Sequence, residues 1–213
     1  MPNTSTMIYS YRIEQAIRAA AVLHDGQTRK GPAPYPYITH LFAVAILLAD
    51  YTTDEDTIIA GLLHDTLEDT DYTPDELEAD FGTHVRAIVE GVTETLRVER
   101  SKYTFEERID RYFDALLAAP PESLLVSAAD KIHNMRSIVE EYHDKPDLFR
   151  KHFTHDIGTM ILKYDRLKNT LTERLQNDIM KEFAHVHELF TQFLATLQHH
   201  HGKEEYDIEK AAS

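Results

Sequence analysis

The sequence predicts an all-α protein that forms one domain. Apolar residues recur at helical spacing nearly everywhere, as at Ile13, Ile17 and Ala20, and no stretch sustains the alternation expected of a strand. The chain has 213 residues, 42% of them hydrophobic, with only 7 glycines and 8 prolines, so it can bury one core without long irregular stretches. We therefore expect a single bundle of helices.

About ten helices are expected in chain order. Two of these helices begin at recognisable capping residues. Thr73 with Glu76 forms a capping box and Pro74 occupies the first helical position, while Thr104 with Glu107 repeats the box. The other bounds follow from the apolar spacing. The expected helices span residues 8–24, 39–51, 55–67, 74–80, 84–98, 105–118, 122–142, 147–153, 157–174 and 177–199.

Two segments fall outside this pattern. Residues 25–38 read DGQTRKGPAPYPYI, and their glycines and prolines cannot continue a helix. Because this loop ends just before His40, we expect it to form one wall of a substrate site. Residues 202–213 are polar and should form a frayed tail. The expected organisation is one domain over residues 1–201, followed by that tail.

Composition excludes several classes of function. The chain has no cysteine, so disulfides, thiolate catalysis and Cys-ligated metals are excluded, and any metal must use His, Asp and Glu. A net charge of −15 argues against non-specific binding to nucleic acid. No segment approaches the ~20 apolar residues that span a bilayer, and the N-terminus lacks a signal-peptide pattern. We expect a cytoplasmic protein that binds neither nucleic acid nor membrane.

Residues 60–70 are the most informative segment, with the sequence AGLLHDTLEDT. An apolar helix ends in His64 and Asp65, and Glu68 and Asp69 follow one turn later. On a helix, His64 and Glu68 are neighbours at i and i+4, as are Asp65 and Asp69. A His-Asp pair alone is more often a surface pair or a capped helix end. Four polar groups crowded onto a core helix instead indicate a function.

Two further residues favour a metal site. His40 opens a helix that continues with the apolar run LFAVAILLA, and Asp130 closes the run LVSAAD of another core helix. Buried acids need a partner, and a divalent cation shared with imidazoles is a sufficient one. Two His and two Asp suit Mn²⁺, Fe²⁺ or Mg²⁺ better than structural zinc. Such a cation would acidify a water towards neutral pH, the nucleophile that hydrolysis needs.

At this point the sequence resembles the HD-domain hydrolases of the RelA/SpoT type, and in particular their short stand-alone members, the small alarmone hydrolases. Four blocks carry the resemblance, in the family's order and spacing. They are residues 24–30 (HDGQTRK), 36–40 (PYITH), 62–70 (LLHDTLEDT) and 129–136 (ADKIHNMR). The resemblance covers roughly residues 12–140. It fades after about residue 143, and the Pro-rich loop at residues 31–35 departs from the family's pattern.

The resemblance implies an HD-domain helical bundle and a Mn²⁺-dependent 3′-pyrophosphohydrolase. Its substrates would be purine nucleotide alarmones, (p)ppGpp or (p)ppApp, and pyrophosphate would be released. Carried over by motif, the metal ligands are His40, His64, Asp65 and Asp130, and the catalytic acids are Glu68 and Asp69. Arg29 and Lys30 would contact the nucleotide, Asn134 the ribose or base, and Lys102 and Arg136 are further local cations for the anionic substrate.

Two other functions stay open on the residues alone. An HD-type nucleotidase or phosphatase acting on another phosphorylated ribose would share every ligand. A nucleotide-binding regulator that has lost catalysis would keep the pocket, although the intact Glu68–Asp69 pair argues against it. Alarmone synthesis is not expected, because the remaining residues read as helices. The choice between guanine and adenine, the physiological metal and the oligomeric state are left open.

Overall fold

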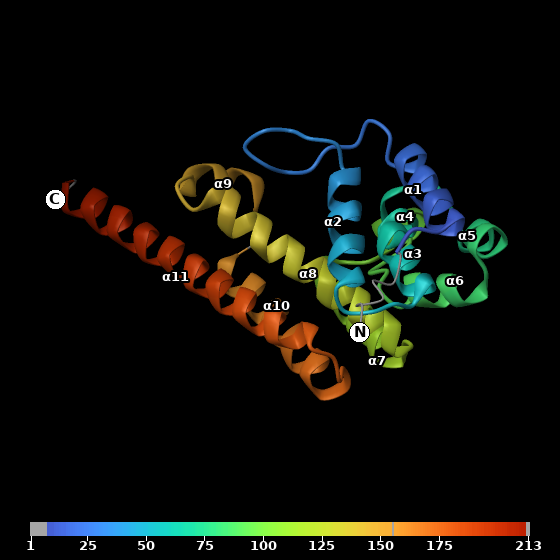
Figure 1. Ribbon diagram of the computed structural model, residues 1–213. Coiled ribbons are helices and arrows are strands. Elements are labelled where there is room, and N and C mark those ends of the chain that lie inside the picture. Colours follow the sequence, from blue (N-terminus) through green and yellow to red (C-terminus); the bar gives the residue numbers. More distant parts are fainter. Residues whose placement is uncertain (1–7, 155, 212–213) are drawn as a thin grey trace.

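The structure is a computed structural model that describes residues 8–154 and 156–211, with side chains up to residue 198. Within this range the only regular elements are helices, so the expected all-α class of about ten helices is confirmed (Figure 1). They are α1 (Tyr11–Leu23), α2 (Ile38–Ala49), α3 (Glu55–Leu63), α4 (Thr66–Asp69), α5 (Pro74–Phe81), α6 (Thr83–Glu90), the 3₁₀ helix η1 (Arg97–Lys102), α7 (Phe105–Ala118), α8 (Pro121–Tyr142), α9 (Pro146–His152), α10 (Ile157–Arg174) and α11 (Ile179–Ala211).

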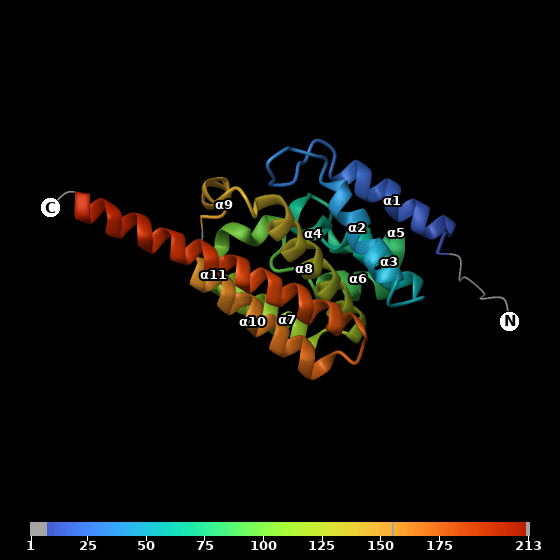
Figure 2. The ribbon, with the colours of Figure 1, turned by 60° about the vertical axis from the view of Figure 1, so that its left-hand side comes forward.

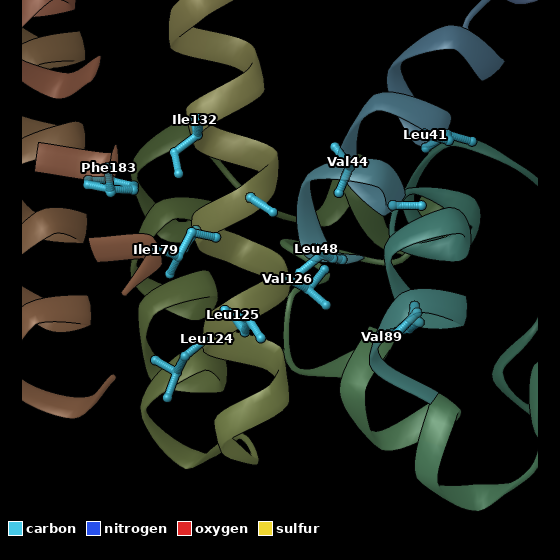
Figure 3. Packing of buried hydrophobic residues seen from close by; sticks show 14 of the residues in the cluster. Leu41, Val44, Leu48, Val89, Leu124, Leu125, Val126, Ile132, Ile179 and Phe183 are labelled. Atoms are coloured by element: carbon cyan, nitrogen blue, oxygen red, sulfur yellow. The ribbon is translucent and has the colours of Figure 1, made fainter. Parts of the chain in front are cut away.

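Helix α8 is the centre of the core. Helices α2 and α3 pack on one side of it and α11 on the other. Ile179 and Phe183 of α11 approach α8, while Val126 of α8 lies beside Leu48 of α2 (Figure 3). All four side chains are buried, and each contributes roughly 1.5–3 kcal/mol relative to an exposed position. Because α8 and α2 carry Asp130 and His40, this packing also positions the site.

Both predicted capping boxes are confirmed. The Thr73 hydroxyl accepts from the backbone N–H of Glu76, and the Glu76 carboxylate accepts from the backbone N–H of Thr73. Thr104 and Glu107 form the same reciprocal pair at the start of α7. These short-range patterns depend on neighbouring residues alone, which is why the sequence locates them.

The expected helix at residues 55–67 is wrong at its end. Helix α3 stops at Leu63, and a turn at His64 and Asp65 leads into the short α4. The His64 ring bonds back to the Gly61 carbonyl and the Thr66 hydroxyl to the Leu63 carbonyl, so side chains satisfy the last carbonyls of α3. The turn reorients His64 and Asp65 at the end of a buried helix.

The expected helix at residues 84–98 is also wrong. Helix α6 ends at Glu90, and a turn precedes η1. A Cβ on Gly91 would lie 2.5 Å from Ser123 Oγ and 2.6 Å from Ala119 Cβ, so glycine here lets α8 approach closely. The Val89 carbonyl then accepts from both the backbone N–H and the hydroxyl of Thr93, at 3.1 and 2.8 Å, so it is satisfied where the helix ends. The chain is thereby free to turn towards α4.

The loop between α1 and α2 is ordered by its own backbone. It turns at Gly26, whose φ is +74°, and Tyr37 donates its backbone N–H to the Gln27 carbonyl. Arg29 donates its backbone N–H to the Tyr35 carbonyl at 3.0 Å. In Figure 1 the loop arches from α1 towards α9, and Lys30 Nζ donates to the His152 carbonyl at 3.4 Å.

The backbone of α11 continues past residue 201 to Ala211 (Figure 2). Side chains from residue 199 onward lie outside the described residues, as do residues 1–7, 155 and 212–213. The division into a domain at residues 1–201 and a tail therefore stays a prediction. No helix in the described range is both long and apolar enough to cross a bilayer.

Candidate metal centre

The four predicted ligands come together from three parts of the fold. His40 lies in the first turn of α2, His64 and Asp65 form the turn after α3, and Asp130 lies in the middle of α8. Ligating atoms of His40, His64 and Asp65 all lie within 4.8 Å of one another. Asp130 Oδ1 is 3.2 Å from His40 Nε2 and 3.6 Å from His64 Nε2. Three of the predicted ligands therefore surround one point, and Asp130 contacts both imidazoles beside it.

Both imidazoles present the same nitrogen to this point. The His64 Nδ1–H donates to the Gly61 carbonyl at 2.9 Å, and His40 Nδ1 bonds to His133 Nδ1 at 2.8 Å. Nε2 of both ligand histidines is buried and has no hydrogen-bond partner among the described residues. Such orphaned nitrogens need an occupant, and a ring whose other nitrogen is hydrogen-bonded is the usual arrangement of a metal-binding histidine. The donor set fits a divalent cation.

His133 contacts the predicted ligand His40 and is a residue that the sequence analysis did not single out. Burial, with His40 beside it, lowers the pKa of His133 to about 4, so the ring is neutral at pH 7. A neutral His133 can accept the Nδ1 proton of His40, which leaves His40 Nε2 with a lone pair for a cation. The residue stands in the ADKIHNMR block, where its spacing of three from Asp130 was the available signal.

The carboxylates stay ionised in this buried place. Burial opposes their charge, but His64 and His40 outweigh it and hold the pKa of Asp65 well below its usual range. For Asp130, Lys131 and His40 likewise overcome burial and lower the pKa. The same carboxylates raise the pKa of His64 against the effect of burial. Cation binding must displace that proton, so metal affinity falls as the pH falls.

Glu68 lies close to the predicted ligand Asp65, and its pKa is raised. Burial first, and then the charges of Asp65 and Glu94, raise the pKa of Glu68 to about 7. Its Oε2 accepts the backbone N–H of Glu94 at 3.3 Å. Burial and Asp65 also raise the pKa of Asp69. Arg100 reaches both acids, at 3.9 Å from Glu68 Oε1 and 3.5 Å from Asp69 Oδ1. A carboxyl group with a pKa near neutrality is suited to proton transfer.

Glu94 forms ion pairs with two basic side chains, Arg108 and Lys163. The sequence analysis singled out none of these three residues. Its carboxylate accepts from Arg108 Nε at 3.1 Å and from Lys163 Nζ at 3.2 Å. Burial, the largest effect, lowers the pKa of Lys163 despite this partner. The turn after α6 is what brings Glu94 to Glu68, and no periodicity in the sequence predicts it. The network fixes the surroundings of Glu68 through contacts between distant helices.

Comparison with known proteins identifies the family. The model of the family described as "HD domain" matches residues 16–157. The chain belongs to the HD-domain family. This HD domain is 41% identical over 127 residues to a GTP pyrophosphokinase of Streptomyces coelicolor, covering 60% of the chain and 15% of that relative. It is 37% identical over 135 residues to the bifunctional (p)ppGpp synthase/hydrolase SpoT of Escherichia coli K12, covering 63% and 19%.

These relatives confirm the resemblance to the RelA/SpoT type, although the HD domain spans less than a fifth of their length. Among solved structures, a metazoan ortholog of SpoT that hydrolyses ppGpp superimposes with a TM-score of 0.68 at 23% identity. The match covers 84% of this chain and 94% of that chain. At this identity the likeness establishes the shared fold.

The loop before α2 contacts Asp65, one of the predicted metal ligands of the HD domain. The Tyr37 hydroxyl donates to Asp65 Oδ2 at 2.6 Å, and the Tyr37 ring stacks on buried His24 with centroids 5.1 Å apart. His24 Nδ1 bonds to Gln27 Oε1, and Gln27 Nε2 donates to the Asp69 carbonyl at 3.0 Å. The loop that contains the HDGQTRK block therefore contacts Asp65 and Asp69 and also lines one side of the predicted substrate site.

A cavity of about 330 Å³ adjoins the metal centre. Three predicted substrate contacts line it: Arg29, Lys30 and Asn134. Asn134 Oδ1 accepts from Arg29 at 2.6 Å, and its amide donates to Asp130 Oδ1, which links the cavity to a predicted metal ligand. The remaining lining residues are Thr28, Tyr37, Ser137, Ile138, Glu141, Tyr142, Phe153 and Tyr164. Three of its aromatic residues, Tyr142, Phe153 and Tyr164, follow the last of the four motif blocks.

The other two predicted contacts lie elsewhere. Lys102 Nζ pairs with Glu99 Oε1 at 3.0 Å in η1, and Arg136 pairs with Glu182 of α11 at 2.7 Å. Both side chains are more than half exposed, and in the described structure neither lines the cavity nor bonds to a ligand residue. Arg136 follows Asp130 by six residues, which turns it to a different face of α8. A role in substrate binding stays a prediction for both, without support from these contacts.

Proposed function

We propose that this HD domain is a Mn²⁺-dependent 3′-pyrophosphohydrolase of purine nucleotide alarmones, (p)ppGpp or (p)ppApp, and that it releases pyrophosphate. The observation that carries the proposal is the convergence of His40, His64, Asp65 and Asp130 beside Glu68, a carboxyl group with a pKa of about 7. A cavity with aromatic walls opens beside them, large enough for a nucleoside. The relatives named for (p)ppGpp chemistry support the choice of substrate.

A divalent cation held by the four ligands would supply Lewis acidity and stabilise charge on a phosphoryl group. The chain's own residues account for the other requirements. Glu68 would accept a proton from the attacking water, because its pKa lies close to the working pH. Arg100 lies beside Glu68 and Asp69 and supplies positive charge near the reacting phosphate. Water would attack the phosphorus attached to the 3′ oxygen, so that the P–O3′ bond breaks.

A panel of purine nucleotides phosphorylated on the 3′ or the 5′ position tests the proposal. We expect pyrophosphate from the 3′-diphosphates alone, with Mn²⁺ supporting a higher rate than Mg²⁺. Orthophosphate from 3′- or 5′-monophosphates would instead indicate an HD-type nucleotidase or phosphatase. Tight nucleotide binding with no turnover in any divalent metal would indicate a regulator that has lost catalysis.

Arg29 is expected to bind the nucleotide without taking part in bond breaking. Its guanidinium bonds to Asn134 and lies 5.4 Å from the centroid of the Tyr37 ring, so both contacts hold it at the cavity wall, where a base could stack on it. For Arg29→Ala we expect KM to rise about 5- to 30-fold with kcat nearly unchanged, from a stacking loss of about 1–2 kcal/mol. Steady-state kinetics with the metal-loaded variant provides the measurement.

The matched control is Arg18→Ala, since Arg18 is an exposed cation of α1 whose ion pair is with Glu14. It should leave both constants unchanged. An unaltered KM in Arg29→Ala would reject the stacking role. A large fall in kcat at constant KM would place Arg29 on the reacting phosphate.

A further inference from the structure

Glu141 places a carboxylate in the cavity at the end remote from the metal centre. It lies in the last turn of α8, is half-buried, and lines the cavity together with Asn134, Ser137 and Ile138 of the same helix face. At about 1.5 Å of rise per residue, Glu141 stands roughly 16 Å along the axis from Asp130, and its side chain leans back towards the helix N-terminus. A ligand lying along this face would have its phosphate at Asp130 and its far end at Glu141.

The carboxylate is fixed by the loop that closes over it. The Tyr35 hydroxyl donates to Glu141 Oε1, and burial together with Glu141 raises the pKa of Tyr35 to about 12. On the other side, Gly31 lies close to the carboxylate, since a Cβ there would lie 2.6 Å from Glu141 Oε2 and the carboxylate would have to shift. The backbone bond from Arg29 N–H to the Tyr35 carbonyl pins the loop. Glu141 Oε2 accepts no hydrogen bond from the residues that the structure describes.

We propose that Glu141 reads the base and makes this HD domain select guanine over adenine, an inference that rests on the proposed function. A carboxylate only accepts hydrogen bonds. The Watson–Crick edge of guanine offers two adjacent donors, N1–H and the N2 amino group. The same part of adenine offers the N1 lone pair and a C–H, which would face the carboxylate without a bond. Buried polar groups left unpaired in this way give strong discrimination.

The position of the charge agrees with this role. An acidic side chain in the site of a polyanion is tolerated only far from the phosphates, since like charges repel. The cations near the metal centre, Lys131 beside Asp130 and Arg100 beside Glu68, lie at the opposite end from Glu141. Arg29, which bonds to Asn134, lies nearer to the metal centre, while Lys30 Nζ donates to the His152 carbonyl at the α9 end. The charges therefore orient a nucleotide with its phosphates at the metal and its base at Glu141.

Equilibrium binding of GDP, IDP and ADP in the presence of Mn²⁺ tests the inference by calorimetry. For the wild type we expect GDP to bind at least about tenfold more tightly than ADP, judged from hydrogen bonds to a charged acceptor. IDP keeps N1–H but lacks the 2-amino group, so its affinity should fall between the two. In Glu141→Gln the amide turns a donor towards the base, and the ratio of GDP to ADP affinity should fall about tenfold or more.

Glu140→Gln is the matched control, because Glu140 is the exposed neighbour on α8 and does not line the cavity. It removes the same charge and should keep the wild-type ratio. If Glu141 serves only to hold Tyr35, Glu141→Gln will weaken GDP and ADP equally, and that result would overturn the inference. Equal affinity of the wild type for GDP and ADP, or no binding of GDP, would overturn it as well.

Binding separates this inference from the proposed function, because it needs no turnover. Selective GDP binding that is lost in Glu141→Gln would support base reading even if the 3′-diphosphates are not hydrolysed. Hydrolysis of (p)ppGpp and (p)ppApp at equal kcat/KM, together with equal GDP and ADP affinity, would keep the function and reject the selectivity.

Discussion

Asp130→Ala is expected to lose both the metal and the activity. Asp130 is the one proposed ligand that comes from α8, and its Oδ1 lies within 3.6 Å of Nε2 of both His40 and His64, so its removal should open the centre. The fall in kcat should be at least as large as the roughly 10²–10⁴-fold typical of losing a catalytic group. Metal content of the purified variant, measured by elemental analysis, is the primary readout. Full occupancy would show that Asp130 is not a ligand.

The thermal stability of Asp130→Ala, with and without chelator, provides a second test. A metal that binds only the folded state at about 100 times its Kd stabilises it by about 2.7 kcal/mol, or roughly 5–10 °C in Tm for a chain of this size. Chelator should therefore lower the Tm of the wild type and leave that of Asp130→Ala unchanged. Asp110→Ala serves as the control, because Asp110 is an exposed carboxylate paired with Arg166 on the surface. Its Tm should respond to chelator as the wild type does.

Glu68→Gln is expected to keep the metal and lose about 10²–10⁴-fold in kcat, because the amide retains the shape but cannot accept a proton. Steady-state kinetics and metal analysis check both parts. The matched control is Glu90→Gln, an exposed acid at the end of α6, which should retain full activity. Near wild-type turnover in Glu68→Gln would assign proton transfer to Asp69 or to solvent.

The same variant should stabilise the metal-free protein at alkaline pH. The pKa of Glu68 is about 7 in the fold against 4.5 ordinarily, so the folded state binds its proton more tightly. Below pH 4.5 the group is protonated in both states. As the pH rises to 7 the unfolded state ionises first, and the free energy of unfolding falls by on the order of 3 kcal/mol. Glutamine removes this loss, so denaturation of the two proteins should differ more at pH 8 than at pH 5.

Local patterns explain why part of the structure could be predicted. The capping boxes depend on residues three apart, and the apolar spacing identified the core helices that carry His40 and Asp130. The four motif blocks contain His40, His64, Asp65 and Asp130, the side chains that lie close together in the structure. Helix interiors and short motifs are encoded within a few neighbouring residues, so one sequence is enough to recognise them.

Contacts between distant residues could not be predicted in this way. The break at His64 depends on side chains that bond back to helix carbonyls, and the break at Gly91 depends on α8 packing against it. Lys163 meets Glu94 across 69 residues, and Tyr35 meets Glu141 across 106. Helical periodicity favours continuation at both breaks, and tertiary packing overrides it. The supporting network around Glu68 and the far end of the cavity therefore appear only in three dimensions.

Hydrolysis of guanosine 3′,5′-bis(diphosphate) in ¹⁸O-labelled water, followed by mass spectrometry of both products, tests the central claim most directly. We predict, with Mn²⁺ and not with chelator, pyrophosphate that carries one ¹⁸O atom and GDP that carries none, because water attacks the phosphorus attached to the 3′ oxygen. Release of orthophosphate, label in the nucleoside product, or turnover that persists in chelator would contradict the assignment of a metal-dependent 3′-pyrophosphohydrolase.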